Sequence, residues 1–134
     1  MTGKPKTSAE SLEKLFQALA DRTRLRLLNL MSGGEICVCF FVEVLAEPQP
    51  KISRHLAYLR SAGLVSTSRN GKWVNYAIQP PDHPAARAVF DAVIAAMNDD
   101  RELQRDRVAL ARACCSPRMP DQLRRAPRPA NPSF

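Results

Sequence analysis

The sequence lacks the features that define several common classes of protein. Its 134 residues contain no apolar run of the roughly 18 residues that a membrane-spanning helix needs, and the first residues lead into an amphipathic stretch rather than an apolar signal core. None of the four cysteines has the C-x2-C spacing of a zinc ribbon, and no phosphate-binding Cys-x5-Arg loop or Ser/His/Asp set stands out. We therefore expect a single folded unit in the cytoplasm, with reduced thiols, no membrane partner and no enzymatic activity.

Acidic residues are missing from one long segment. The chain has 20 Lys and Arg against 13 Asp and Glu, a formal net charge of +7, and a basic excess favours a polyanionic partner. Residues 48–81 contain no Asp or Glu. The basic residues of this acid-free stretch are Lys51, Arg54, Arg60, Arg69 and Lys72. The stretch is the predicted footprint of a nucleic-acid-binding surface, and a solvated basic face is the plainer alternative.

Hydrophobic periodicity and capping signals predict a mainly helical fold with one β-hairpin. Thr7, with Glu10 three positions later, is typical of a capping box, and Asn70-Gly71 between two alternating segments indicates a hairpin turn. The expected helices cover residues 7–20, 21–32, 37–46, 50–62 and 84 to at least 98, and the expected strands cover 64–69 and 72–79. Two short helices around a tight turn, followed by a hairpin, predict a winged helix-turn-helix in the order α-α-α-α-β-β-α.

The C-terminal residues differ in composition from the rest. Residues 116–134 are rich in proline and arginine and contain almost no aliphatic side chains, a composition that cannot bury enough surface to fold. We expect a flexible N-terminus over 1–8, one winged helix-turn-helix DNA-binding domain over 9–115, and a disordered tail over 116–134. The arginines of the tail either add nonspecific phosphate contacts or only keep the protein in solution.

Four segments together resemble the ArsR/SmtB family of metalloregulatory repressors. They are L-A-D-R-T-R-L-R-L-L (19–28), E-I-C-V-C (35–39), Q-P-K-I-S-R-H-L-A-Y-L-R-S-A-G-L-V (49–65) and G-K-W-V-N-Y-A-I (71–78). The resemblance, over roughly residues 12–97, implies a homodimeric repressor of the arsenic-responsive branch. Its fourth helix would enter the major groove of a palindromic double-stranded DNA operator, and its first and last helices would form the dimer. The chain departs from the family motif at Phe40, where an aspartate is usual, and at Val42, where a third cysteine often stands.

The predicted fourth helix and wing carry the expected DNA contacts. Side chains at the N-terminal end of the helix can reach base edges, and cations of the wing can hold the sugar-phosphate backbone. The candidate DNA-binding residues are Gln49, Lys51, Ser53, Arg54, His55, Tyr58, Arg69 and Lys72. Tyr58 has two possible roles, a phosphate contact or packing within the protein. We expect Trp73 to pack against the fourth helix rather than to contact DNA.

Two cysteine pairs are candidate metal ligands. Residues two apart on a regular helix face away from each other, so joint chelation by Cys37 and Cys39 requires an irregular first turn; the alternative is that one or both are small buried hydrophobes. The resemblance implies that the ion binds at this pair. Trivalent arsenic takes three thiolates, so we expect Cys114 or Cys115, from the same chain or from the partner, to supply a missing ligand.

A soft ion is the expected inducer. The resemblance favours As(III), with Sb(III), methylarsenite, Cd(II) and Pb(II) as alternatives, and no cofactor is required for DNA binding itself. Drawing the thiols onto the ion should distort the third helix, move the fourth and lower DNA affinity. The competing hypotheses are a thiol redox sensor on the same fold, a constitutive architectural DNA binder, and a thiol-based arsenate reductase.

Overall fold

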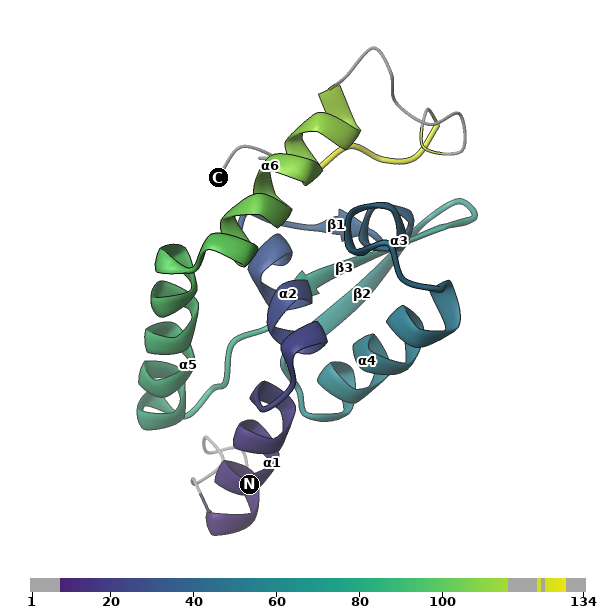
Figure 1. Ribbon diagram of the computed structural model, residues 1–134. Helices are drawn as coiled ribbons and strands as arrows, with labels where there is room; N and C mark the ends of the chain where they lie inside the picture. The colour runs from purple at the N-terminus through teal and green to yellow at the C-terminus, as the bar shows by residue number, and fades with distance from the viewer. Residues whose placement is uncertain (1–7, 116–122, 124, 130–134) are drawn as a thin grey trace.

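The chain folds into a set of helices packed with a small three-stranded sheet, whose longer hairpin projects beyond them (Figure 1), and the computed structural model describes residues 8–115, 123 and 125–129. The elements are α1 (Ala9–Leu19), α2 (Arg22–Met31), β1 (Ile36–Cys37), α3 (Val38–Leu45), α4 (Gln49–Ser61), β2 (Val65–Asn70), β3 (Trp73–Ile78), α5 (Pro84–Ala96), the 3-10 helix η1 (Met97–Asp99) and α6 (Arg101–Cys115). The antiparallel sheet has the strand order β1-β3-β2. Among the described residues, no helix is both long enough and apolar enough to cross a bilayer.

Helices α3 and α4 and the β2–β3 hairpin form the predicted winged helix-turn-helix. Ala46 ends α3 with a left-handed φ of 54°, and Pro48 then caps α4. The hairpin closes at Gly71, whose φ of 62° suits a residue without a Cβ. The mainly helical winged-helix fold is therefore confirmed. Strand β1 is an addition that periodicity could not detect, because it contains two residues and exists through its pairing with β3.

The start of α1 differs by one residue from the predicted capping box. The Ser8 side chain accepts a hydrogen bond from the Ser11 backbone N–H at 3.1 Å, so Ser8 is the cap of α1. Thr7 lies outside the described residues. The second predicted cap is confirmed, because Asp21 Oδ1 accepts from the Arg24 N–H at 3.0 Å.

The single last helix expected from Pro84 onward is two helices joined by η1. Asp100 breaks the helical path with φ −90° and ψ 132°, and its Oδ2 accepts from the Leu103 N–H at 3.0 Å. Asp100 therefore caps the new helix α6. A carboxylate in this position favours a helix start, which the apolar spacing alone did not reveal.

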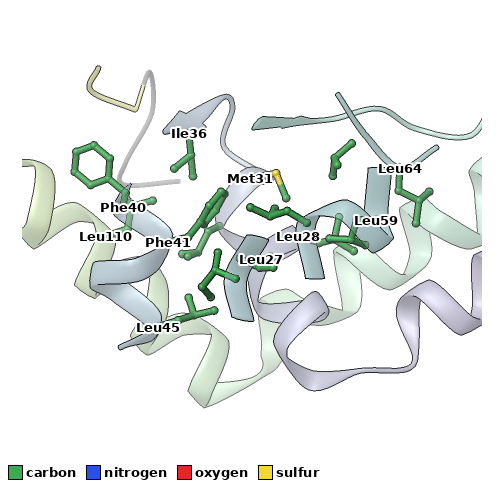
Figure 2. Packing of buried hydrophobic residues seen from close by; sticks show 14 of the residues in the cluster. Leu27, Leu28, Met31, Ile36, Phe40, Phe41, Leu45, Leu59, Leu64 and Leu110 are labelled. Carbon is green, nitrogen blue, oxygen red and sulfur yellow. The ribbon is translucent and has the colours of Figure 1, made fainter. Parts of the chain in front are cut away.

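The core lies between α2, α3, α4 and the sheet (Figure 2). Its largest fully buried side chains come mostly from these elements: Leu27, Leu28, Leu30 and Met31 from α2, Ile36 from β1, Phe40 and Phe41 from α3, and Ile52, Leu56 and Leu59 from α4. Fully burying one such side chain contributes about 1.5–3 kcal/mol. The buried stripe of α4 thus fixes this helix to the core and leaves its other face outside.

A buried polar network joins α6 to α2. The Arg26 guanidinium donates to both carboxylate oxygens of Asp106, at 2.8 and 3.0 Å, and this hydrogen bonding raises the pKa of Arg26. Asn29 Nδ2 donates to the Leu103 carbonyl at 2.9 Å, and Arg107 Nε donates to Asn29 Oδ1 at 2.8 Å. Because Asp106 and Asn29 are buried, this face of α6 packs against α2 of the same chain and is not exposed to a partner protomer.

The described part of the C-terminal tail contains buried side chains. Leu123 and Ala126 are 1% and 5% exposed and belong to the hydrophobic core cluster. At these two positions the structure departs from the expectation of a disordered tail, because an isolated leucine can pack where the folded domain leaves an apolar hollow. Residues 116–122, 124 and 130–134, on which the same expectation falls, lie outside the described residues.

Candidate DNA interface and thiol site

The candidate DNA residues of α4 divide into an outward and an inward set. Gln49 and Arg54 are exposed, and Ser53 is partly exposed. Lys51 forms an ion pair with Glu47 at 3.0 Å, and its side chain keeps 38% of its surface accessible. These four residues lie in the first half of α4, where a helix N-terminus also favours a phosphate group.

His55 belongs to the inward set, although its position in the sequence suggested a DNA contact. Its side chain is 16% exposed, and its Nδ1 accepts from Arg24 Nη1 at 3.3 Å and lies 3.8 Å from Asp21 Oδ1. Burial lowers the pKa of His55, and the neighbouring cations Arg24, Arg54 and Lys51 lower it further, while Asp21 opposes them. The geometry therefore makes His55 a contact between α4 and the start of α2.

Arg24 is a structural residue that the sequence reasoning missed. Its Nε donates to the Ala18 carbonyl and its Nη2 to the Gln17 carbonyl, both at 2.8 Å. Its guanidinium carbon also lies 4.1 Å from the centroid of the Tyr58 ring, a cation–π geometry. Arg24 thus joins the end of α1, the start of α2 and α4, and Tyr58 packs on it while remaining 43% exposed.

The wing presents its cations outward. Arg69 and Lys72 are exposed on either side of the hairpin turn. The Lys72 Nζ lies 5.1 Å from the centroid of the Trp73 ring. Trp73 is partly buried and packs against the core cluster, and together with Cys39 and Val42 of α3 it lines a hollow that reaches only the first residue of α4. The expectation that it packs rather than faces outward agrees with this position, although α3 supplies more of its surroundings than α4.

Cys37 and Cys39 meet because the helix between them starts late. Cys37 lies in β1 with extended backbone, φ −69° and ψ 141°, and α3 begins at Val38. The two Sγ atoms are 2.9 Å apart, with the Cys39 thiol donating to Cys37. The irregular entry that joint chelation requires is therefore present. Cys37 is also 1% exposed, so it is a buried side chain at the same time.

The surroundings of the pair shift the pKa values of the two thiols in opposite directions. The hydrogen bond from Cys39 lowers the pKa of Cys37 to about 7, against the effect of burial, and backbone N–H groups of Cys39, Val38 and Val74 add to the lowering. The same hydrogen bond to Cys37 raises the pKa of Cys39, and burial raises it further. One thiolate stabilised by one thiol is thus available near neutral pH.

The second cysteine pair lies in the last turn of α6. Cys114 is buried, and its Sγ donates to the Ala111 carbonyl at 3.4 Å. Cys115 ends the helix, and its side chain lies outside the described part of the structure. Among the described side chains, no three His, Cys, Asp or Glu residues gather where they could hold one metal ion. The structure therefore does not bring Cys114 to the Cys37/Cys39 pair within one protomer.

A hollow of about 490 Å³ lies between Cys39 and two residues of the candidate DNA surface, Gln49 and Lys72. Its apolar lining includes buried Leu123 of the tail, and the polar side chains around it are exposed. The lining residues are Cys39, Val42, Glu43, Gln49, Lys72, Trp73 and Leu123. Cys39, Gln49 and Lys72 are candidate residues from separate segments of the sequence, and the fold brings all three to one hollow.

Comparison with known proteins matches the same region of the chain. Residues 21–67 match the model of the family described as bacterial regulatory protein, arsR family. The arsenical resistance operon repressor of Escherichia coli (strain K12) is 47% identical over 79 residues, which are 58% of this chain and 68% of that protein. The arsenic resistance transcriptional regulator ArsR1 of Pseudomonas putida is 39% identical over 109 residues, covering 79% of this chain and 82% of that protein.

A solved structure has a similar backbone. The homodimeric winged helix-turn-helix DNA-binding domain from Mycobacterium bovis, determined by NMR in solution, matches with a TM-score of 0.56 and 25% sequence identity. The match covers 74% of this chain and 92% of that domain.

Proposed function

The chain belongs to the arsR family of bacterial regulatory proteins, and on that premise we propose that it is an arsenic-responsive repressor, dimeric and acting in the cytoplasm. It is a transcriptional regulator and not an enzyme. In this proposal the dimer binds a palindromic operator, and binding of trivalent arsenic to the Cys37/Cys39 pair releases it. Two relatives whose names refer to arsenic resistance support the choice of ion.

The main support for release of DNA by ion binding is the hollow that Cys39, Gln49 and Lys72 line together. Gln49 is the first residue of the recognition helix, and Lys72 belongs to the wing, so a change at the thiol pair acts directly on both DNA-facing elements. The pair also lies where α3 begins, and α3 and α4 are joined by the three residues 46–48. Moving Sγ atoms onto an ion therefore shifts the start of α3 and the helix that follows it.

The DNA surface in this proposal consists of the outward residues of α4 and the wing. Gln49, Lys51, Ser53 and Arg54 face the major groove, and Arg69 and Lys72 hold the backbone beside it. The absence of acidic residues between 48 and 81 supports this assignment, because every charged side chain of this stretch then attracts phosphate. Glu47, which pairs with Lys51, lies just before the stretch. His55 and Tyr58 take part through α2, by keeping α4 in position.

The dimer in this proposal forms through α1 and α5. Phe16 of α1 is 53% exposed, and α5 has a row of partly buried apolar side chains, Ala86, Val89, Val93 and Ile94, beside one buried residue, Phe90. Helix α6 is already bound to α2 by the Arg26–Asp106 pair, so the second half of the expected last helix is left out. The homodimeric Mycobacterium bovis domain supports a dimer of this fold.

The thiols suit a soft trivalent ion. Cys37 supplies a thiolate near neutral pH and Cys39 lies 2.9 Å away, so both can bond one arsenic atom. Sb(III), methylarsenite, Cd(II) and Pb(II) share this preference for sulfur. The same proximity supports one second candidate, a redox switch in which an oxidant joins Cys37 and Cys39 and releases DNA. Cys114 and Cys115 would then act in the partner protomer or not at all.

Mobility-shift titrations of the operator complex test the proposal. As(III) should release the wild-type protein and the Cys114→Ser/Cys115→Ser variant at similar concentrations, whereas Cys37→Ser/Cys39→Ser should stay bound. The double serine variant of α6 is the matched control, because it removes the same number of thiols. Release of the Cys37→Ser/Cys39→Ser variant by As(III) would contradict the assignment of the arsenic site to Cys37 and Cys39. Release by peroxide under metal-free conditions, without release by arsenite in the presence of reductant, would favour the redox switch.

A further inference from the structure

One buried polar atom beside the thiol pair has no partner. Asn75 of β3 is 5% exposed, and among the described residues its Oδ1 is the buried side-chain nitrogen or oxygen atom without a hydrogen bond. A buried acceptor without a partner costs about 1–3 kcal/mol, so a natural protein seldom keeps one without a use.

Asn75 lies directly opposite Cys37 in the sheet. The two residues are Cα partners in the antiparallel β1–β3 pairing. Side chains of directly opposed residues lie on the same face of a sheet, with Cβ atoms about 4.5–5.5 Å apart. Trp73, two residues earlier on β3, lies on this face too and lines the hollow with Cys39. The Asn75 side chain with its unpartnered oxygen therefore lies on the same face of the sheet as the Cys37 thiol.

Two thiols leave a trivalent arsenic atom with one oxygen. When As(OH)3 reacts with two thiols, two As–S bonds form and two As–O bonds break. Two water molecules leave with the thiol protons, and neither arsenic nor sulfur changes oxidation state. One hydroxyl remains on arsenic and needs an acceptor for its proton in this buried position. Within one protomer, the described side chains bring no third thiol to the pair.

We propose that Asn75 is the third, oxygen-based contact of the arsenic site, with its Oδ1 accepting the hydrogen bond of the remaining As–OH group. The proposal rests on the proposed function of the Cys37/Cys39 pair and adds the chemical form of the ligand, a trivalent arsenic hydroxide held by two sulfurs. Arsenic binding gives the Asn75 Oδ1 atom a hydrogen-bond donor. Part of the binding affinity then comes from removing the free-energy cost of this unsatisfied buried oxygen in the free protein.

A pair of arsenicals separates this contact from general damage to the site. Phenylarsine oxide also forms two As–S bonds, but its third substituent is a phenyl group bonded through carbon, so the bound form has no hydroxyl. The hollow beside Cys39 offers about 490 Å³, which is within the usual range for small-molecule sites. Binding is followed through the fluorescence of Trp73, the single tryptophan of the chain, in the absence of DNA and with a phosphine reductant.

Asn75→Leu should weaken arsenite binding about tenfold and leave phenylarsine oxide binding within about twofold of the wild type. Without ligand, its melting temperature should stay the same or rise, because an unsatisfied polar group is removed. Asn75→Ala serves as the second variant if the leucine does not fit. Ser66→Ala is the matched control, since Ser66 is an exposed residue of β2 that pairs with Ala77, the next residue of β3 on the same face as Asn75.

Equal loss of both arsenicals, or unchanged arsenite binding, would overturn the role of Asn75. A failure of the proposed function itself would give a different result, in the cysteine variant rather than in the Asn75 variants. In that case Cys37→Ser/Cys39→Ser would still respond to arsenite, whatever the behaviour of the Asn75 variants.

Discussion

The guanidinium of Arg24 lies over the ring of Tyr58 at 4.1 Å, and this contact ties the recognition helix to the helix pair beneath it. Arg24 also binds two carbonyl groups at the end of α1 and the imidazole of His55. Its side chain is only 12% exposed. Arg24 therefore adds a polar connection between α4 and the proposed dimer helix α1 to the apolar packing that holds α4 on the core.

Replacing Arg24 should weaken DNA binding indirectly. Arg24→Gln removes charged donors from the Gln17 and Ala18 carbonyls and should cost about 2–3 kcal/mol of folding stability. Operator affinity should fall at temperatures where the variant is fully folded, because α4 loses its support. Urea unfolding and fluorescence anisotropy measure the two effects. Arg22→Gln is the control, since the Arg22 side chain is 82% exposed, and a similar loss of affinity there would contradict the role given to Arg24.

The docking of α6 should depend on Asp106. Asp106→Ala leaves Arg26 largely buried without its partner and should lower the free energy of unfolding by about 3 kcal/mol, measured by urea denaturation. Asp91→Ala breaks the Arg87–Asp91 pair, whose side chains are 52% and 57% exposed, and should cost less than about 1 kcal/mol. Equal costs would mean that the α2–α6 network contributes no more than a surface pair.

Acid should destabilise the protein through His55. Burial lowers the pKa of His55 in the folded chain, so below its ordinary value the unfolded chain binds more protons. The stability associated with neutral His55 is present above about pH 6.5 and is lost as the pH falls through the lower folded pKa. Thermal unfolding between pH 7.5 and 5 should show this slope, and His55→Gln should flatten it. An unchanged slope in the variant would contradict the inward position of His55.

Arg54 should contribute directly to operator affinity. Arg54→Ala removes an exposed cation from the recognition helix and should reduce operator affinity with little change in stability. If Arg54 binds a phosphate, the slope of log affinity against log salt should fall by about one; if it reads a base, specificity at one operator position should relax instead. Arg105→Ala is the matched control, because Arg105 is exposed on α6, outside the proposed DNA surface and the proposed dimer helices. An Arg54→Ala variant with wild-type affinity would remove Arg54 from the DNA surface.

Local signals explain why much of the fold could be predicted. The Asp21 cap, the Asn70-Gly71 turn and the apolar stripe of Ile52, Leu56 and Leu59 each act within a few residues of the chain, so their effect can be read without the fold. The break at Asp100 was missed because the apolar spacing continues on both sides of it, while the cap that starts α6 depends on a single side chain.

The sequence by itself determined the acid-free stretch, the spacing of the cysteine pairs and the family motif, because these follow from residue type and spacing. Tertiary structure decided which polar residues point inward and which atoms meet. His55 contacts Arg24 across 31 positions, and Arg26 contacts Asp106 across 80. Asn75 comes to Cys37 only through the pairing of β1 with β3. Such contacts arise when separate elements pack together, and helical or strand periodicity within one element contains no information about them.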